Sequence, residues 1–351
     1  MAKLSVIVPI YNVEEYLDWC LESLCNQTFA DIEILCVNDG TKDRSREIAS
    51  RFADADSRFV ILDKPNGGLS SARNMGIRAA TAPFVCFVDS DDRMTLDACE
   101  RIVATFNKTD ADIVTFGANC YPESAGNNWL VEHLSPRDVE YVNFSTDILF
   151  KEMSRPFAWR TACKKSFLIE NNLFFDETLL FGEDQLFHFA IYPRAEKTVF
   201  ISDKLYDYRV SREGSLMHQI EQNPERKMAE HINIIKYIFD DWNSGFFLKQ
   251  YPAEMIGWTA EFALYGIANQ EAAVRDKLLS DLRKVWFCYF LKDEIANLKL
   301  PKASKHMIKE ALKEQDSFVG KKGKLLRYFF YVEQYGIRVS AGKLVNRLMK
   351  R

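Results

Sequence analysis

The chain has 351 residues, 47% of them hydrophobic and 27% charged, which excludes a disordered, collagen-like or low-complexity protein. A formal net charge of −4 gives no general case for nucleic-acid binding. No apolar run reaches the roughly 18 residues that span a bilayer, and the run Leu4–Ile10 is too short for a signal peptide. The eight cysteines match no zinc pattern. We therefore expect a cytoplasmic protein.

The charge is unevenly distributed along the chain. Residues 299–351 contain 14 Lys and Arg against 4 Asp and Glu. The remainder therefore holds 32 of the 46 basic residues and 46 of the 50 acidic ones. An acidic body with a basic tail indicates that the tail has a binding partner of its own.

The first third of the chain alternates short apolar runs with helical patterns. Because this is a βαβ order, it predicts an α/β fold with a mostly parallel sheet, flanked by helices and joined by right-handed crossovers. Ligands of such sheets bind beyond the carboxyl ends of the strands, so the residues just after each apolar run are the first candidates for a site. Strands are predicted at 4–8, 32–37, 59–62, 84–88 and 112–116, and helices at 14–26, 45–53, 70–80 and 95–106.

The rest of the chain has two further patterns, a mixed one and then a helical one. Residues 119–218 mix loops and aromatic residues, with a strand near 198–201. From Asn223, a good helix cap followed by proline, the pattern is helical, with further helices at 253–269, 271–291 and 302–315.

The segment Val37–Asp43 follows the second predicted strand and contains Asp39 and Gly40. An acid at the carboxyl end of a strand can accept a hydrogen bond from a nucleobase or a ribose. The alternative is a tight turn in which Asp39 caps the next helix.

The segment Asn66–Gly76 is a glycine-rich loop that opens a helix. Its backbone N–H groups suit an anion, and Arg73 could reach a phosphate or a base. The alternative is a turn with Ser70 as N-cap. The glycines of this loop have neither the GxGxxG spacing of dehydrogenases nor the spacing of a P-loop. The sequence therefore lacks the motif that usually supports assignment to either class.

The segment Phe84–Asp92 ends a buried strand in three carboxylates within four residues. Gathering like charges is unfavourable unless a cation or hydrogen-bond donors neutralise them. Mg²⁺ and Mn²⁺ suit an Asp-x-Asp pattern that shares them with substrate phosphates. The alternative has Asp92 capping the helix near Thr95 while the other two are solvated.

Two later segments carry polar side chains. Glu183 and Asp184 stand between apolar residues and could provide a general base in a partly dry site, or simply begin a helix. Residues 206–218 are predicted as a loop whose Arg209, Ser215 and His218 could bind a diphosphate and complete a metal shell. A lone His such as His218 is more often structural.

Taken together and in this order, these motifs resemble glycosyltransferase family 2, the inverting enzymes of the GT-A fold. The resemblance begins at Ser5–Asn12, continues through the Asn-Asp-Gly turn, the Gly-Gly…Ala-Arg-Asn-x-Gly loop and Asp-Ser-Asp-Asp, and fades after Tyr-x-Tyr-Arg. The chain as a whole resembles bacterial transferases that build lipopolysaccharide, capsule or other surface glycans. Asn38 departs from the family pattern, in which many members have Asp.

The resemblance implies three regions and a role for each motif. Residues 1–118 would form the nucleotide-sugar-binding half of a GT-A domain, 119–218 its acceptor-binding half, and 219–351 a helical extension. Asp184, with Glu183 beside it, would be the general base. Trp159 and Lys164 are candidates for the acceptor site. A metal, Mn²⁺ or Mg²⁺, would be held by Asp91, Asp89 and His218. The UDP-sugar would be bound by Pro9, Tyr11, Glu14, Asp39, Gly68, Arg73, Asp89, Ser90, Arg209 and Ser215.

The reaction implied by the resemblance is transfer of a sugar from a UDP-sugar to a hydroxyl of a glycan or lipid-linked acceptor, with the segment 205–218 closing over the donor. One rival is a sugar nucleotidyltransferase, whose usual Gly-x-Gly-Thr-Arg loop is absent here. A second rival is a catalytically idle protein that kept the fold for binding.

The basic tail contains Gly320–Tyr331 and, further on, an apolar face of Ile337, Ala341, Leu344, Val345 and Leu348. A basic amphipathic helix with aromatic residues suits an anionic membrane surface. We therefore expect residues 320–351 either to hold the protein at the inner face of the plasma membrane or to pack on the body with a solvated basic face.

Overall fold

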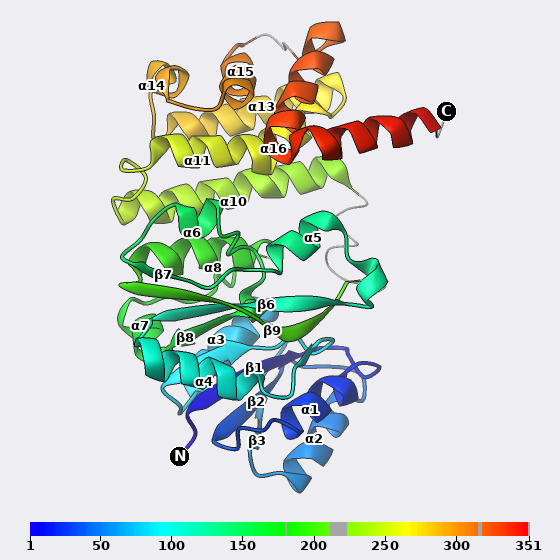
Figure 1. Cartoon of the computed structure of the whole chain (residues 1–351), viewed down its shortest axis with the longest axis vertical. Coiled ribbons are helices and arrows are strands. Elements are labelled where there is room, and N and C mark those ends of the chain that lie inside the picture. Colours follow the sequence, from blue (N-terminus) through cyan, green and yellow to red (C-terminus); the bar gives the residue numbers. More distant parts are fainter. Residues whose placement is uncertain (180, 211–222, 315–317, 350–351) are drawn as a thin grey trace. The chain divides into compact units, whose positions relative to one another are not determined.

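The computed structural model describes residues 1–179, 181–210, 223–314 and 318–349, with side chains as far as residue 336. It divides into two compact units, Met1–Glu213 and Gly214–Arg351 (Figure 1). The predicted boundary between residues 118 and 119 falls inside a strand, Ile113–Tyr121, so the two halves of the first unit share one sheet.

Within the described residues, nine strands of the first unit form one mixed sheet, in the order β3-β2-β1-β4-β8-β6-β9-β5, with β7 paired to β9. Strands β3, β2, β1 and β4 are parallel to one another, as predicted. Strand β8 enters antiparallel between β4 and β6. The strands are β1 Leu4–Ile10, β2 Ile32–Asn38, β3 Phe59–Asp63, β4 Phe84–Phe87, β5 Arg93–Met94, β6 Ile113–Tyr121, β7 Val139–Val142, β8 Thr161–Lys164 and β9 Lys197–Arg209.

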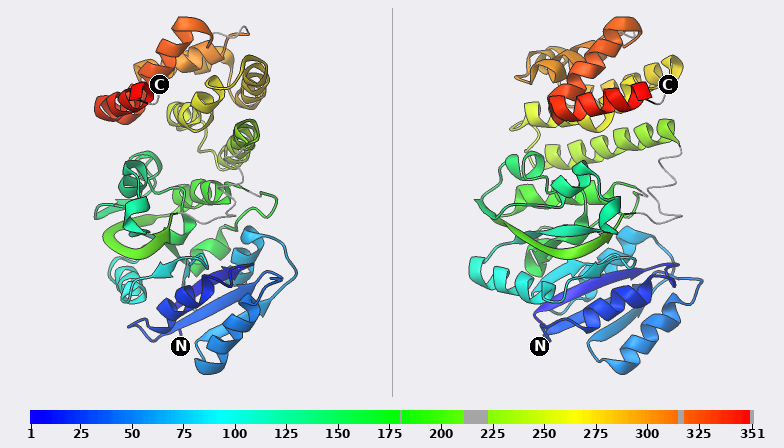
Figure 2. Two further views of the ribbon diagram at one scale, coloured as in Figure 1. Left: turned by 90° about the vertical axis from the view of Figure 1, so that its right-hand side faces the viewer. Right: turned by 45° about the vertical axis from the view of Figure 1, so that its right-hand side comes forward.

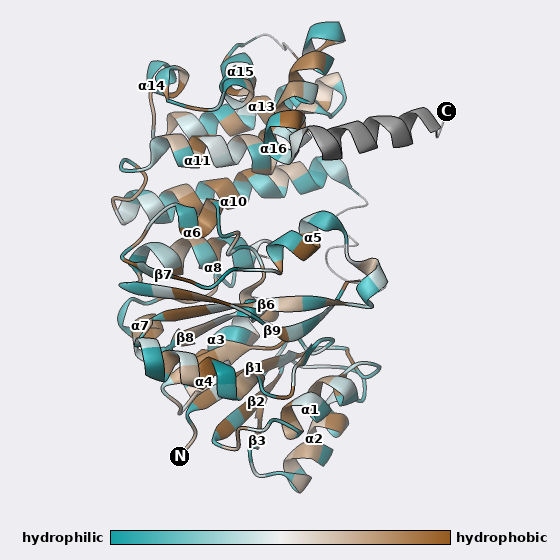
Figure 3. Cartoon of the chain, in the orientation of Figure 1, coloured by the Kyte–Doolittle hydropathy of each residue, from teal (hydrophilic) through white to brown (hydrophobic). Residues whose placement is uncertain are grey.

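Helices cover the sheet (Figures 2 and 3), whose strand β1 is buried along its whole length. On one face of β1, Leu4, Val6 and Val8 join a core with residues of α1, α2 and α4. On the other face α3 lies so close that a Cβ at Gly76 would come within 2.4 Å of Ile7. The helices of this unit are α1 Leu17–Cys25, α2 Ser45–Ala55, α3 Leu69–Ala79, α4 Ala98–Thr109, α5 Asn128–His133, α6 Asp147–Phe150, α7 Lys165–Glu170 and α8 Glu183–Ile191, with short 3₁₀ turns η1 Glu123–Ala125, η2 Ala158–Arg160 and η3 Tyr192–Arg194.

The first residues of the segment 206–218, which is predicted as a loop, form the end of strand β9. Tyr206 and Arg209 lie in β9, which pairs with β6 along one side and with β5 along the other. Residues 205–209 are therefore part of the sheet and not of a closing loop. The predicted strand 198–201 is only the first third of β9, because long-range pairing extends it.

The second unit is helical, as predicted. Trp242 and Trp286 are buried in its core, and the indole N–H of Trp286 donates to Thr259 Oγ1 at 3.2 Å. The predicted helix 253–269 is continuous but contains a π-helical turn, η4 Ala260–Leu264. The helices are α10 Pro224–Ser244, α11 Pro252–Thr259, α12 Tyr265–Ala268, α13 Ala272–Phe287, α14 Lys292–Asn297, α15 Lys302–Ala311 and α16 Gly320–Met349. None of these or the other described helices is long and apolar enough to cross a bilayer.

The tail forms α16, which is interrupted at Gly336. Glu333 of α16 accepts the N–H groups of Ala303 and Ser304 at the start of α15, at 2.7 and 2.8 Å. Phe330 is buried, whereas Leu325 is exposed. One face of this helix therefore packs on the second unit while another faces solvent. The predicted apolar face 337–348 lies outside the described side chains.

Candidate active site

The carboxyl ends of β1, β2 and β4 meet at one edge of the sheet, because these strands are parallel and in register. The three segments that follow them bring Tyr11, Asp39 and Asp89 to that edge. The structure therefore brings these three candidates together at the end of the sheet that the sequence predicted.

Arg73 of α3 is the centre of the acidic cluster. Its side chain is 1% exposed, and its Nη2 donates to Asp89 Oδ1 at 2.9 Å. Its Nη1 donates to Asp184 Oδ1 at 2.6 Å and to Glu183 Oε1 at 3.3 Å. The sequence predicted that Arg73 would reach a phosphate or a base. Instead, its two terminal nitrogens are engaged by three carboxylates from two motifs.

Glu183 and Asp184 open α8, directly after Gly182. The φ of Gly182 is +77°, a conformation that a side chain disfavours, and it turns the chain so that both acids stand in the first helical turn. Asp184 Oδ2 accepts the N–H of Ala158 at 3.0 Å. Each oxygen of this carboxylate is thus held by one donor, Arg73 or Ala158.

The pKa values of the two neighbouring acids are shifted in opposite directions. Burial and the charge of Asp184 raise the pKa of Glu183, in spite of Arg73. Burial also acts to raise the pKa of Asp184, but the charge of Arg73 and the N–H of Ala158 outweigh it and lower the pKa below its ordinary value. Asp184 is therefore the acid of this pair that is held ionised.

Asp92 joins the cluster to β9. It is 2% exposed and accepts the hydroxyl of Tyr206 at 2.9 Å and the backbone N–H of Arg209 at 2.7 Å. It does not cap a helix, because α4 begins at Ala98 with Asp97 as N-cap. Tyr206 is not among the residues predicted for the site, although the Tyr-x-Tyr alternation places Tyr206 and Tyr208 on one face of a strand.

Arg209 lies at the end of β9 beside the same cluster. Its Nε donates to the backbone oxygen of Asp91 at 2.9 Å. Its guanidinium carbon lies 4.9, 4.7 and 5.3 Å from the ring centroids of Tyr16, Trp19 and Tyr121. These rings hold the cation by cation–π attraction, so the side chain of Arg209 is fixed beside Asp91.

The donor set fits a divalent cation. Burial, with the charges of Asp184 and Asp91, raises the pKa of Asp89 even though Arg73 is bonded to it, so a cation nearby would stabilise the ionised form of this acid. The described residues contain no group of three or more His, Cys, Asp or Glu side chains that could hold a metal alone. Mg²⁺ and Mn²⁺ need only one or two carboxylates when substrate phosphates complete the shell, and Asp91 and Asp89 could supply these.

Asp39 is bonded to the glycine turn, and its predicted contact with a nucleobase stays a prediction. It is 3% exposed, and its carboxylate accepts the N–H groups of Gly67 and Gly68 at 2.9 and 2.8 Å. It also accepts the Nδ2 of Asn66 at 3.1 Å and the Nζ of Lys64. Four donors occupy the four lone-pair sites of a carboxylate. This arrangement favours a role in shaping the glycine turn over the direct contact with uracil that the sequence predicted.

The remaining donor-site candidates lie near that edge with different exposures. Tyr11 is 41% exposed, while Pro9, within β1, and Ser90 are buried. Glu14 forms an ion pair with Arg44, with Oε2 and Nε 3.3 Å apart. Ser215 and His218 lie outside the described residues.

The structure supports neither acceptor candidate. Trp159 is 2% exposed and stacks on Tyr206, with ring centroids 4.2 Å apart, so its side chain belongs to the core. Lys164 pairs with Phe84 in the antiparallel register of β8 and β4, which places it at the amino end of β4, opposite the acidic cluster. Its Nζ lies 2.7 Å from Asp110.

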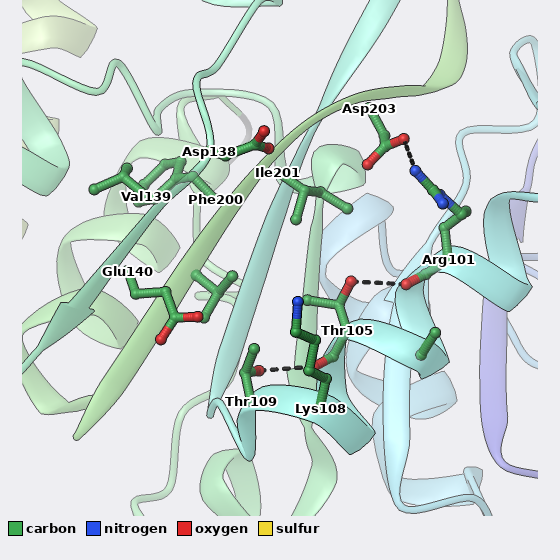
Figure 4. Close-up of a pocket in the computed structure, with 12 residues that line it drawn as sticks. Arg101, Thr105, Lys108, Thr109, Asp138, Val139, Glu140, Phe200, Ile201 and Asp203 are labelled. Atoms are coloured by element: carbon green, nitrogen blue, oxygen red, sulfur yellow. Dashed lines mark hydrogen bonds and ion pairs between the residues drawn. The ribbon is translucent and has the colours of Figure 1, made fainter.

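A separate hollow of about 620 Å³ lies between α4 and strands β7 and β9 (Figure 4). Two of its charged side chains are in ion pairs, since Arg101 pairs with Asp203 and Glu140 pairs with Lys197 at 3.0 Å. None of its lining residues belongs to the candidate site.

Carboxylates from two motifs gather around one arginine at the carboxyl ends of the parallel strands, where ligands of α/β sheets bind. Comparison with known proteins identifies the family. The glycosyl transferase family 2 model matches residues 5–167. The chain is 34% identical over 223 residues to glycosyltransferase GlyG of Streptococcus pneumoniae, covering 61% of this chain and 72% of GlyG. The chain belongs to glycosyltransferase family 2.

Two further comparisons bear on the extent of this likeness. The chain is 37% identical over 213 residues to glycosyltransferase EpsJ of Bacillus subtilis, covering 58% of this chain and 60% of EpsJ. The crystal structure of Staphylococcus aureus TarS residues 1–349 with UDP-GlcNAc matches 95% of this chain and 92% of that chain, with a TM-score of 0.70 at 21% identity. This second likeness concerns the fold.

Proposed function

We propose that this chain is an inverting transferase that moves a sugar from a UDP-sugar to a hydroxyl of a glycan or lipid-linked acceptor. The observation that carries the proposal is the single guanidinium of Arg73, which binds Asp89 of one motif and Asp184 of another. The carboxylate that would take a proton therefore lies one side chain away from the carboxylates that would face the diphosphate.

In this mechanism Asp184 is the general base. It takes the proton from the acceptor hydroxyl as that oxygen attacks the anomeric carbon, and the bond to UDP breaks with its electron pair leaving on the β-phosphate. Displacement from the opposite side inverts the centre, so an α-linked donor gives a β-linked product. The guanidinium of Arg209 stabilises the negative charge that develops on the departing diphosphate. A divalent metal held by Asp91 and Asp89 would supply further neutralisation of that charge.

The choice of UDP is supported by the fold neighbours, because TarS structures hold UDP and UDP-GlcNAc. The relatives by sequence are named as bacterial glycosyltransferases, and one as a teichoic acid biosynthesis protein. We therefore propose a role in building a bacterial surface polysaccharide. UDP-GlcNAc is the first donor to test.

A second part of the proposal concerns α16 at an anionic membrane. Leu325 and Phe329 are 54% and 52% exposed, and Lys321 and Lys324 are exposed on the same stretch of helix. Apolar and aromatic side chains beside lysines suit the headgroup region of an anionic bilayer. Such a position would bring a lipid-linked acceptor to the enzyme.

The proposal is tested by UDP release from a panel of UDP-sugars, with and without Mn²⁺, in the wild type, Asp91→Ala and a control, Asp54→Ala, which removes an exposed acid of α2. We expect metal-dependent release from one sugar, lost in Asp91→Ala and kept in the control. If no sugar is turned over, calorimetry with UDP and Mn²⁺ decides. If UDP binds with Mn²⁺, the assignment of a UDP-sugar donor stands and turnover requires an acceptor. If UDP does not bind, the assignment of a UDP-sugar donor is contradicted.

A further inference from the structure

A row of aromatic rings leads from the surface of the first unit into the candidate site. Trp129 of α5 lies 6.4 Å from Phe157 between ring centroids, and Phe157 lies 5.6 Å from Tyr208. Trp129 is 42% exposed, whereas Phe157 and Tyr208 are half-buried. The row therefore has one end that a ligand can reach.

The inner end of the row touches the proposed base. Phe157 precedes Ala158, whose N–H donates to Asp184 Oδ2 at 3.0 Å. Tyr208 in turn stacks on Trp159, with ring centroids 5.1 Å apart, and Trp159 directly follows Ala158 in the chain. A ligand on the exposed end would thus lie on the approach to Asp184.

The backbone at Phe157 is held in an unusual conformation. Its φ is +30° and its ψ is 77°, a left-handed region that residues with a Cβ disfavour. This turn sets the ring of Phe157 against Trp129 and directs the next N–H at Asp184. Backbone strain of this kind clusters at functional sites.

Trp129 is itself fixed in place. His133, one helical turn later, packs against it with ring centroids 4.0 Å apart and the planes tilted by 33°, and its Nδ1 lies 2.8 Å from the backbone oxygen of Trp129. A ring held in this way loses little freedom when a ligand binds.

We propose that Trp129 and Phe157 form an acceptor subsite that binds the face of a pyranose ring and presents one of its hydroxyls to Asp184. This inference rests on the proposed transferase function. The faces of aromatic rings are negative and attract the C–H groups on the flat face of a pyranose. An acyclic polyol has no rigid face to offer and loses more conformational freedom on binding. The subsite therefore favours a pyranose-containing glycan over a polyol phosphate chain.

The test is to measure the binding of neutral sugars to the full chain by saturation-transfer NMR, in the presence of UDP. The probes are cellobiose, lactose and N,N′-diacetylchitobiose, with ribitol as the acyclic comparison. We expect at least one disaccharide to bind the wild type. Its affinity should fall about tenfold in Trp129→Ala, the scale of one lost aromatic stacking contact, and be largely restored in Trp129→Phe.

Tyr237→Ala is the matched control, because it removes a partly exposed aromatic ring from α10 of the second unit. It should leave sugar binding unchanged. The proposal is overturned if no disaccharide binds the wild type, if ribitol binds as well as the disaccharides, or if Trp129→Ala binds as tightly as the wild type.

UDP affinity measured on the same samples separates this inference from the proposed function. Sugar binding without UDP binding would support the subsite and contradict the UDP-sugar donor. UDP binding without sugar binding would support the donor and overturn the subsite.

Discussion

Arg73 and Asp184 stand 111 residues apart in the chain, yet their Nη1 and Oδ1 atoms are 2.6 Å apart. The same guanidinium holds Asp89 at 2.9 Å. Three acidic side chains share this one buried cation, so its removal would leave them uncompensated. This relationship ties the chemistry of the proposed base to the integrity of the donor motif.

Replacing Asp184 with Asn should lower turnover by about 10²–10⁴-fold, the usual cost of losing a general base, because an amide cannot accept the proton. UDP affinity should remain close to that of the wild type. Turnover is measured by UDP release and affinity by calorimetry, with Asp54→Asn as a control for an exposed acid. Turnover that survives in Asp184→Asn but is lost in Glu183→Gln would move the base to Glu183.

Replacing Arg73 with Lys should change the pH dependence of kcat/KM. Activity requires ionised Asp184, and Arg73 lowers the pKa of that carboxyl against the effect of burial. The acid limb of the wild-type profile should therefore lie below the ordinary Asp value of about 3.9. The single ammonium of a lysine at this position cannot bond all three acids, so the pKa of Asp184 should rise. As the pH is lowered, the variant should therefore lose activity at a higher pH than the wild type does. Superimposable profiles between pH 4 and 9 would contradict this role.

Replacing Asp39 with Asn should destabilise the ligand-free protein. The Asn amide would point an N–H₂ group at donors that now bond a carboxylate, and a hydrogen bond to a charged group contributes about 1.5–3 kcal/mol. Urea unfolding measures the loss, with Asp54→Asn expected to change stability by less than about 0.5 kcal/mol. If Asp39 instead only contacts uracil, Asp39→Asn will weaken UDP binding while the free protein keeps its stability.

Reversing two charges on α16 should weaken binding to anionic vesicles. Each lysine near an anionic surface contributes about 1 kcal/mol, so Lys321→Glu with Lys324→Glu should reduce binding by more than about tenfold. Point variants are preferable to truncation, because Glu333 of α16 bonds the start of α15.

The control for this measurement is Lys249→Glu with Lys292→Glu, which makes the same charge change at exposed sites elsewhere in the second unit. Co-sedimentation with phosphatidylglycerol vesicles gives the affinity. Equal loss in both double variants would mean that net charge alone matters, and no loss in either would contradict the membrane role of α16.

Much of the fold follows from local sequence patterns. The order of β1 to β4 with their helices, and the helical second unit, could be predicted because apolar periodicity reports which side of an element is buried. The positions of Asp89 and Asp184 as candidates followed from motifs at element ends. Helix starts were less well predicted, with α1 beginning at Leu17 and α4 at Ala98.

The partners of those candidates were decided by the tertiary structure. No local pattern indicates that Arg73 would turn inward to three acids, that the carboxylate of Asp39 would be filled by four donors, or that Trp159 would be buried. Lys164 lies at the wrong edge of the sheet because β8 enters antiparallel, and a register between distant strands leaves no trace in either strand alone. The sequence by itself determined which elements form and which residues stand at their ends, since both depend on neighbours along the chain. Only the folded sheet decided which side chains meet, because those contacts join segments up to about a hundred residues apart through pairing that local periodicity does not encode.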